Sequence, residues 1–112
     1  MTTLDHGLLA ETFDNAADMF DKLGVSTGGF IDDQGRPCAI NALASSCPGY
    51  TMYPQVVKLR EAFWQYVPEA ERETFGFLPA WSDYFGATDP QHVIDTMRYA
   101  AKSELVLAEA AS

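Results

Sequence analysis

The fold of this chain depends on FGFLPAWSDYFGATDPQHVI, residues 75–94. The segment is the densest in aromatic side chains, and six large apolar residues fall within eleven positions: Phe75, Phe77, Leu78, Trp81, Tyr84 and Phe85. Pro79 interrupts any long helix, which favours a loop that anchors these rings in the core. Asp89 followed by Pro90 then matches the N-cap and first position of a helix. We therefore expect a loop that leads directly into a last helix, ending near Leu107.

The rest of the sequence predicts a few amphipathic helices. Apolar residues recur at spacings of three and four, the pattern of one helix face. With the last one, the expected helices cover residues 8–23, 37–46, 54–67 and 89–107. A further helical turn is expected at 69–75, and the turn residues of segment 30–38 allow one minimal β-hairpin. The fold class is therefore predicted as all-α, a compact bundle of about four helices with short loops, in one domain over residues 1–112.

Composition and charge narrow the class of function. The 112 residues carry a net charge of −9, and their seven Lys and Arg are scattered. This argues against direct binding of nucleic acid, which needs clustered basic side chains. No apolar run approaches the ~20 residues of a membrane span, and the N-terminus lacks the basic start of a secretory signal. We expect a cytoplasmic protein in which Cys38 and Cys47 are buried thiols.

An acidic stripe lies beside the apolar face of the first expected helix. Glu11, Asp14, Asp18 and Asp21 recur at spacings of three and four, so their carboxylates share a face. Such a stripe is usually a solvated surface, but it is also the pattern of a docking surface for a basic partner. The three aspartates are accordingly predicted to steer a partner by charge.

Aromatic residues are concentrated in the middle of the chain. Ten of the fourteen lie between Tyr50 and Phe85. A core of this size absorbs many of these rings, and one interpretation is that they only cover it. Tyr and Trp are also enriched at the hot spots of protein interfaces. On that interpretation Tyr50, Tyr53 and Trp64 are predicted to be the apolar anchors of a partner-binding surface.

Trp81 and Asp83 are predicted to be structural residues of the loop before the last helix. Trp81 is expected to anchor the core, and Asp83 to accept backbone N–H groups that hold the loop. The alternative is a small pocket with a Trp wall and a carboxylate, close to His92. Cys38, His92 and Asp83 can be written as a catalytic set, but any short chain with these residue types permits one. The cysteines and histidines lack the spacing of a zinc site, so we predict no metal, no cofactor and no catalytic residue.

Three short motifs resemble a family of small proteins of unassigned function from actinobacteria and their phages. They are Cys38-Ala-Ile-Asn-Ala42, Trp81-Ser-Asp83 and the helical segment 89–101. They are similar to the Cys-x-x-Gly-Ala helix, the Trp-Asn-Asp loop and the closing amphipathic helix of that family. Asn41 and Ser82 depart from its pattern. The resemblance implies a fold and an actinobacterial or phage origin, and it carries no catalytic role.

These observations lead to three hypotheses of function. The first is a small acidic module that binds a protein, in the phage setting a protein of the host, which it inhibits or redirects. The second is a mimic of nucleic-acid charge that occupies a DNA-binding protein through the acidic stripe. The third is an enzyme with a small pocket near Asp83 and His92. The sequence also leaves open a homodimer formed through the aromatic surface.

Overall fold

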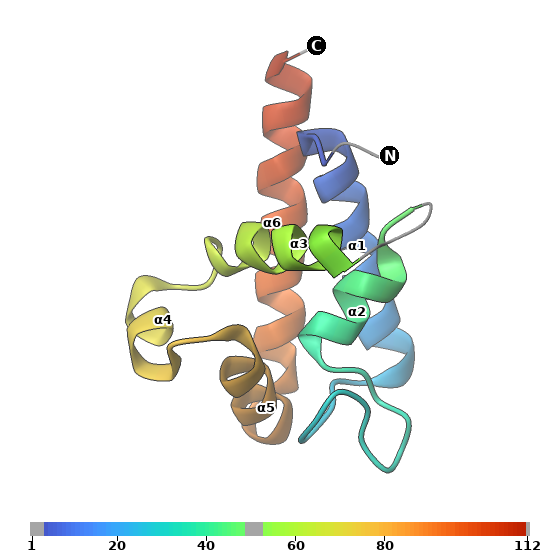
Figure 1. The fold of residues 1–112 in the computed structure, drawn as a ribbon, viewed down its shortest axis with the longest axis vertical. Coiled ribbons are helices and arrows are strands. Elements are labelled where there is room, and N and C mark those ends of the chain that lie inside the picture. The colour runs from blue at the N-terminus through green and yellow to red at the C-terminus, as the bar shows by residue number, and fades with distance from the viewer. Residues whose placement is uncertain (1–3, 49–52, 112) are drawn as a thin grey trace.

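Two long antiparallel helices form the frame of the protein, whose computed structural model describes residues 4–48 and 53–111. α1 (His6–Leu23) and α6 (Pro90–Ala111) lie side by side along the longest dimension, about 40 Å (Figure 1). Each turns one apolar face inward, as its three-four spacing predicts. The fully or nearly buried residues of these faces are Leu9, Phe13, Ala16, Ala17, Phe20, Val93, Met97, Ala100 and Ala101.

The ends of the two long helices follow the expected capping chemistry. The Asp5 carboxylate accepts a hydrogen bond from the Leu8 N–H at 2.8 Å, which satisfies one free donor of the first turn of α1. Gly24 ends α1 with a φ of 87°, a backbone conformation that glycine adopts without strain. α6 begins at Pro90, the first helical position that the sequence indicates.

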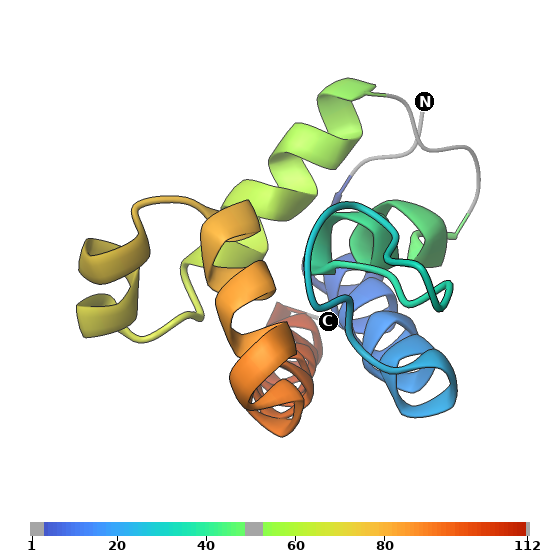
Figure 2. The ribbon, with the colours of Figure 1, turned by 90° about the horizontal axis from the view of Figure 1, so that it is seen from below.

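Four shorter helices close the core on one side of this frame. They are α2 (Ala39–Ser46), α3 (Tyr53–Trp64), α4 (Glu69–Phe75) and α5 (Leu78–Thr88). Figures 1 and 2 show α3 crossing the frame and α5 lying between α3 and the first turns of α6. Trp81 of α5 and Phe63 of α3 meet edge to face in the core, with their ring centroids 5.7 Å apart. None of the helices found in the described residues is long and apolar enough to cross a membrane.

The predicted number of helices is wrong, because the described residues form six. The error lies in segment 75–94, where the expected loop is largely the helix α5. Pro79 lies in the first turn of α5, where the backbone N–H has no partner within the helix, so proline is tolerated there. Gly76, with a φ of 78°, ends α4 and lets the chain turn between the two helices. Trp81 and Asp83 are therefore helical residues, and their assignment to a loop is corrected.

The predicted hairpin is also wrong. Segment 30–38 contains a single antiparallel bridge, between Ile31 and Pro37, and no strand is found among the described residues. Two hydrogen bonds make this bridge, from the Asp32 N–H to the Arg36 carbonyl and from the Cys38 N–H to the Phe30 carbonyl, and α2 begins directly after it at Ala39. The segment is held instead by Asp32, whose carboxylate accepts hydrogen bonds from three backbone N–H groups and from Arg36.

Gly86 sets how closely α5 packs against the segment that follows α1. A Cβ atom at this position would overlap the carbonyl oxygen of Ser26. Only glycine therefore allows this approach. The contact fixes α5 close to the core, which in turn places Phe77 and Leu78, at its start, beside α3.

Candidate functional site

A surface hollow between α3 and the start of α5 is the candidate functional site. It encloses about 310 Å³. Its lining contains two of the three predicted aromatic anchors and consists of Tyr53, Val57, Arg60, Glu61, Trp64, Phe77 and Leu78. The first five residues come from α3 and the last two from the start of α5. The wall of the hollow is thus made by elements that the core holds in place.

The sequence of α3 explains why these residues face outward together. Successive residues are rotated by about 100°, so Tyr53, Val57 and Trp64 fall within an arc of about 40°. Leu59 and Phe63 lie about 140° and 100° around the helix from the centre of this arc, and both are completely buried. Because the face with Leu59 and Phe63 is buried, the face with Tyr53 and Trp64 lies at the surface. Along the helix Tyr53 and Trp64 are about 16 Å apart, at 1.5 Å per residue.

The rings of this surface have little of the packing that core rings have. Tyr53 is 76 % exposed and Phe77 is 57 % exposed. Trp64 is half-buried and packs partly against the core. Arg60 and Glu61 place one positive and one negative side chain at the lining. The arrangement offers an elongated apolar surface with polar groups beside it, which is the anatomy of a protein-binding patch.

Tyr50, the third predicted anchor, lies outside the described residues. The structure therefore brings Tyr53 and Trp64 together and leaves the position of Tyr50 untested. Phe77 and Val57 complete the hollow, and the sequence interpretation missed both. Phe77 was assigned to the core with the other rings of segment 75–94. The four-residue spacing from Tyr53 to Val57 was the signal that could have found Val57.

The predicted acidic stripe forms ion pairs with an arginine of the same domain. The Arg98 guanidinium of α6 contacts the carboxylates of Asp14, Asp18 and Asp21 at 2.9, 2.9 and 2.5 Å. The hydrogen bonds to Asp18 and Asp21 raise the pKa of Arg98 above its ordinary value. The three aspartates remain half-exposed, and one guanidinium neutralises only part of their charge. Their first role in the structure is to tie α1 to α6.

Trp81 and His92 form a partly buried cluster with a carboxylate of α4. The Trp81 indole N–H donates to Glu71 Oε1 at 2.9 Å, and His92 Nε2 lies 2.6 Å from the same oxygen. The His92 ring also packs on Phe85, with the centroids 4.5 Å apart. Because α4 buries none of its own residues, this cluster is one of the contacts that hold it to the domain.

Asp83 lies apart from His92 and does not form the predicted pocket with it. Trp81 and Phe85 are the α5 residues that pack on the His92 ring. Asp83 is two residues from each, about 200° around the helix, and so it faces the other side. There it accepts a hydrogen bond from the Gly29 N–H at 3.2 Å. Asp83 thus binds a backbone N–H, although from a different segment than the sequence indicates.

The two cysteines are free thiols. Cys38 and Cys47 are both buried. Cys38 precedes α2, and its sulfur accepts a hydrogen bond from the Asn41 N–H at 3.5 Å. Burial raises the pKa of the Cys38 thiol, and the nearby charge of Asp83 adds to the effect. A raised pKa lowers the thiolate fraction, which opposes a role as a nucleophile.

One buried acid went unrecognised in the sequence. Glu104 of α6 is only 5 % exposed. Its carboxylate accepts a hydrogen bond from the Tyr66 hydroxyl and lies 2.7 Å from Nδ1 of His6. Burial and the bond to Glu104 raise the pKa of Tyr66. Glu104 falls on the apolar face of α6 between Ala101 and Leu107, and that position was the available signal. The cluster links the start of α1 and the later turns of α6 to Tyr66, two residues after the end of α3.

Comparison with known proteins places the chain in a family. It belongs to a family of unknown function, DUF6197, whose family model matches residues 6–103. Neither the curated proteins nor the solved structures gave a match. The resemblance found in the sequence is confirmed at this level, while its motifs and the actinobacterial or phage origin stay predictions. Among the described residues there is no group of three or more His, Cys, Asp or Glu that could hold a metal ion.

Proposed function

We propose that this domain acts by binding another protein, and that the α3/α5 hollow is its contact surface. The observation that carries the proposal is the exposure of Tyr53 and Phe77 around one hollow with the half-buried Trp64. Leaving such rings in water is unfavourable, and covering them contributes the largest energies of known interfaces. The domain has no catalytic role in this proposal.

The shape of the hollow sets the kind of partner. The distance of about 16 Å between Tyr53 and Trp64 exceeds the reach of a single side chain and matches about three turns of a helix. An amphipathic helix of the partner, with apolar side chains at three-four spacing, fits this surface. The net charge of −9 favours a partner whose other surfaces are basic. In the phage setting that the motifs suggest, this partner is a protein of the bacterial host.

Capture from a bacterial lysate followed by titration with the purified partner tests the proposal. Two phenylalanines make a matched pair, because Phe77 and Phe30 are each 57 % exposed and only Phe77 lines the hollow. Phe77→Ala and Trp64→Ala should weaken binding by about tenfold or more. Phe30→Ala should leave it within about twofold.

Two outcomes would overturn the proposal. One is a partner whose affinity falls equally with Phe77→Ala and Phe30→Ala. The other is binding that survives Trp64→Ala and Phe77→Ala but is lost at high salt, since that behaviour belongs to a charge mimic. The pairing of Arg98 with three aspartates already reduces the charge that such a mimic would present.

A further inference from the structure

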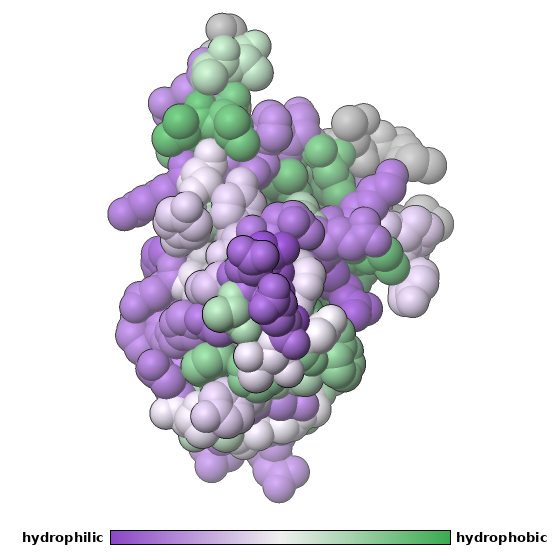
Figure 3. Space-filling model, turned by 90° about the vertical axis from the view of Figure 1, so that its left-hand side faces the viewer, coloured by the Kyte–Doolittle hydropathy of each residue, from purple (hydrophilic) through white to green (hydrophobic). Residues whose placement is uncertain are grey.

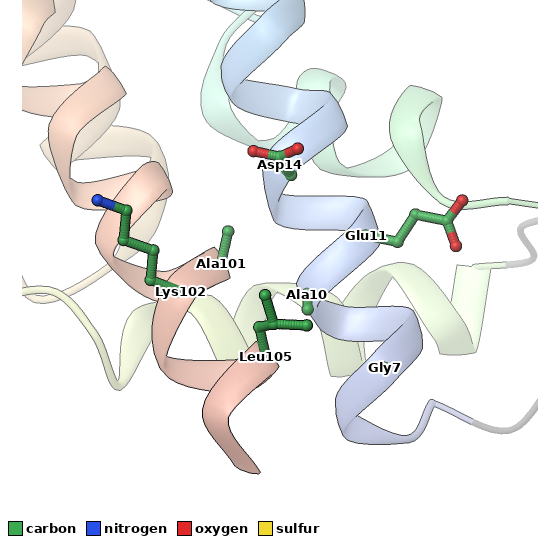
Figure 4. A pocket seen from close by; sticks show the side chains of 7 residues that line it. All are labelled: Gly7, Ala10, Glu11, Asp14, Ala101, Lys102 and Leu105. Atoms are coloured by element: carbon green, nitrogen blue, oxygen red, sulfur yellow. The ribbon is translucent and has the colours of Figure 1, made fainter. Parts of the chain in front are cut away.

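A second apolar surface lies on the frame of the molecule, in the groove between α1 and α6 (Figure 4). The groove encloses about 290 Å³ and is lined by Gly7, Ala10, Glu11, Asp14, Ala101, Lys102 and Leu105. Its lining shares no residue with the α3/α5 hollow. It is therefore a separate surface from the one in the proposed function.

Leu105 is the exposed apolar centre of this groove. Figure 4 shows its side chain between the two helices, directed toward Ala10, with Ala101 beside it. Leu105 is 50 % exposed, although it lies next to α1. The last turns of α6 continue past the groove, and Figure 3 shows hydrophobic side chains gathered at this projecting end, at the top of the view. An apolar side chain in this position is stabilised by anything that removes it from water.

The rims of the groove carry opposite charges on opposite sides. Figure 4 shows Glu11 leaving α1 to one side and Lys102 leaving α6 to the other, so they point apart. Within residues 4–48 and 53–111, neither side chain forms a hydrogen bond or an ion pair with another residue. Asp14, in contrast, is bound to Arg98. The groove thus has an apolar centre with one unpaired acidic rim and one unpaired basic rim.

We propose that a second copy of this chain covers the groove, with a two-fold axis running along it. A rotation of 180° about that axis places α1 of each copy opposite α6 of the other. Each Glu11 then faces a Lys102 of the second copy, while the two Leu105 side chains come together in the centre. A two-fold interface requires a surface that complements itself, and opposite charges on the two rims of one groove meet that requirement. A wholly basic partner would meet Lys102 as a like charge.

The net charge of each chain works against this dimer. Two chains of −9 repel each other, and this repulsion is screened beyond about 8 Å at physiological ionic strength. The dimer should therefore form at about 0.15 M salt and protein concentrations of tens of micromolar, and dissociate on dilution. Sedimentation equilibrium of the full chain over a range of concentrations measures this directly. A chain that stays monomeric at about 200 μM under these conditions would overturn the proposal.

Neighbouring residues on α6 provide a matched pair for the apolar centre. Leu105→Glu puts a charge into the groove, and it should weaken the dimer by about a hundredfold. Val106→Glu adds the same charge one residue further on, about 100° around the helix, at a side chain that is 64 % exposed and lies outside the groove lining. It should leave the dimer within about threefold. Equal loss in the two variants would show that general repulsion, not the groove, controls association.

Reversal of the rim charges tests the pairing itself. Glu11→Lys and Lys102→Glu should each weaken the dimer by about tenfold, and the double variant should restore it. Glu11→Lys also lowers the net charge to −7, so a model based on repulsion alone predicts a tighter dimer for this variant. Phe77→Ala must leave the dimer intact. Dissociation of the dimer by Phe77→Ala would mean that the α3/α5 hollow joins the copies, and it would overturn this inference. The proposed function would still be decided separately, by the binding of a foreign partner.

Discussion

The sequence suggests two surfaces for partner binding, and in the folded protein one is exposed to solvent while the other is paired with a side chain of the same domain. The aromatic surface of α3 stays open, with Tyr53 and Phe77 largely in solvent. The acidic stripe of α1 is tied down, because Arg98 contacts three of its carboxylates. From the sequence alone, the aromatic residues and the acidic stripe were equally plausible as partner-binding surfaces. The difference teaches that an exposed pattern becomes a candidate interface only when no other helix of the same domain supplies its partner.

Substitution of the two tryptophans compares a core ring with a ring of the aromatic surface, and it gives the largest expected effect on stability. Trp81 is completely buried, whereas Trp64 lines the hollow. Trp81→Ala should lower the free energy of unfolding by about 3–5 kcal/mol, from lost burial and the cavity left behind. Trp64→Ala should lower it by less, about 1–2 kcal/mol, because Trp64 is only partly buried. Urea denaturation followed by circular dichroism measures both, and equal losses would show that Trp64 is a core residue.

Removal of Arg98 should open the acidic stripe. Arg98→Met leaves three carboxylates side by side, so the domain should lose about 1–2 kcal/mol of stability at low salt. The loss is modest because the aspartates are half-exposed. Screening in about 1 M salt should reduce it. Melting temperatures at the two salt concentrations test this, with Lys58→Met, at an exposed position outside both surfaces, as the control of equal charge change. A salt-independent loss would point to packing instead of charge.

Asp32 lies outside both surfaces, and its carboxylate makes the stability of the domain depend on pH. Burial raises the pKa of Asp32, but hydrogen bonds from Arg36, Thr27 and Gln34 outweigh it and hold the pKa at about 2. The unfolded chain has a pKa of about 3.9 at such a residue. The stabilising contribution of Asp32 is therefore present above about pH 4 and is lost as the pH falls toward about 2.

Comparison of Asp32→Asn with the wild type tests this sign. The difference in melting temperature should be largest near pH 6 and shrink below about pH 4. Asp33→Asn is the matched control, because Asp33 is the exposed neighbour of Asp32. If the two variants showed the same pH profile, the hydrogen-bonded role of Asp32 would be wrong.

The smallest expected effect on stability belongs to the most exposed anchor. Tyr53→Ala should change the free energy of unfolding by less than about 0.5 kcal/mol, since Tyr53 is 76 % exposed. Tyr53→Ala should nevertheless weaken binding of the partner, as Phe77→Ala does. This combination separates a binding residue from a structural one. A large loss of stability would instead place Tyr53 among the residues that hold α3.

The sequence by itself determined the long helices and most of the core. The three-four spacing of apolar residues, Asp5 and Gly24 at the ends of α1, and Pro90 at the start of α6 are local signals, and local signals specify helices well. The sequence did not predict α5, because a proline inside an apolar segment indicates an interruption, whereas Pro79 lies in a first turn, where proline is tolerated. Whether such a proline begins or breaks a helix depends on the packing of Trp81, which is not a local property.

Only the tertiary structure decided which side chains have partners. Arg98 lies 77 to 84 residues from the aspartates that it binds, and Glu104 lies 98 residues from His6. No spacing along the chain signals such contacts, because they depend on how α6 is placed against α1. The same placement leaves Tyr53, Trp64 and Phe77 around a hollow and Leu105 in an uncovered groove. The pattern of residues fixes which side chains are candidates, and the arrangement of the helices decides which of them remain available.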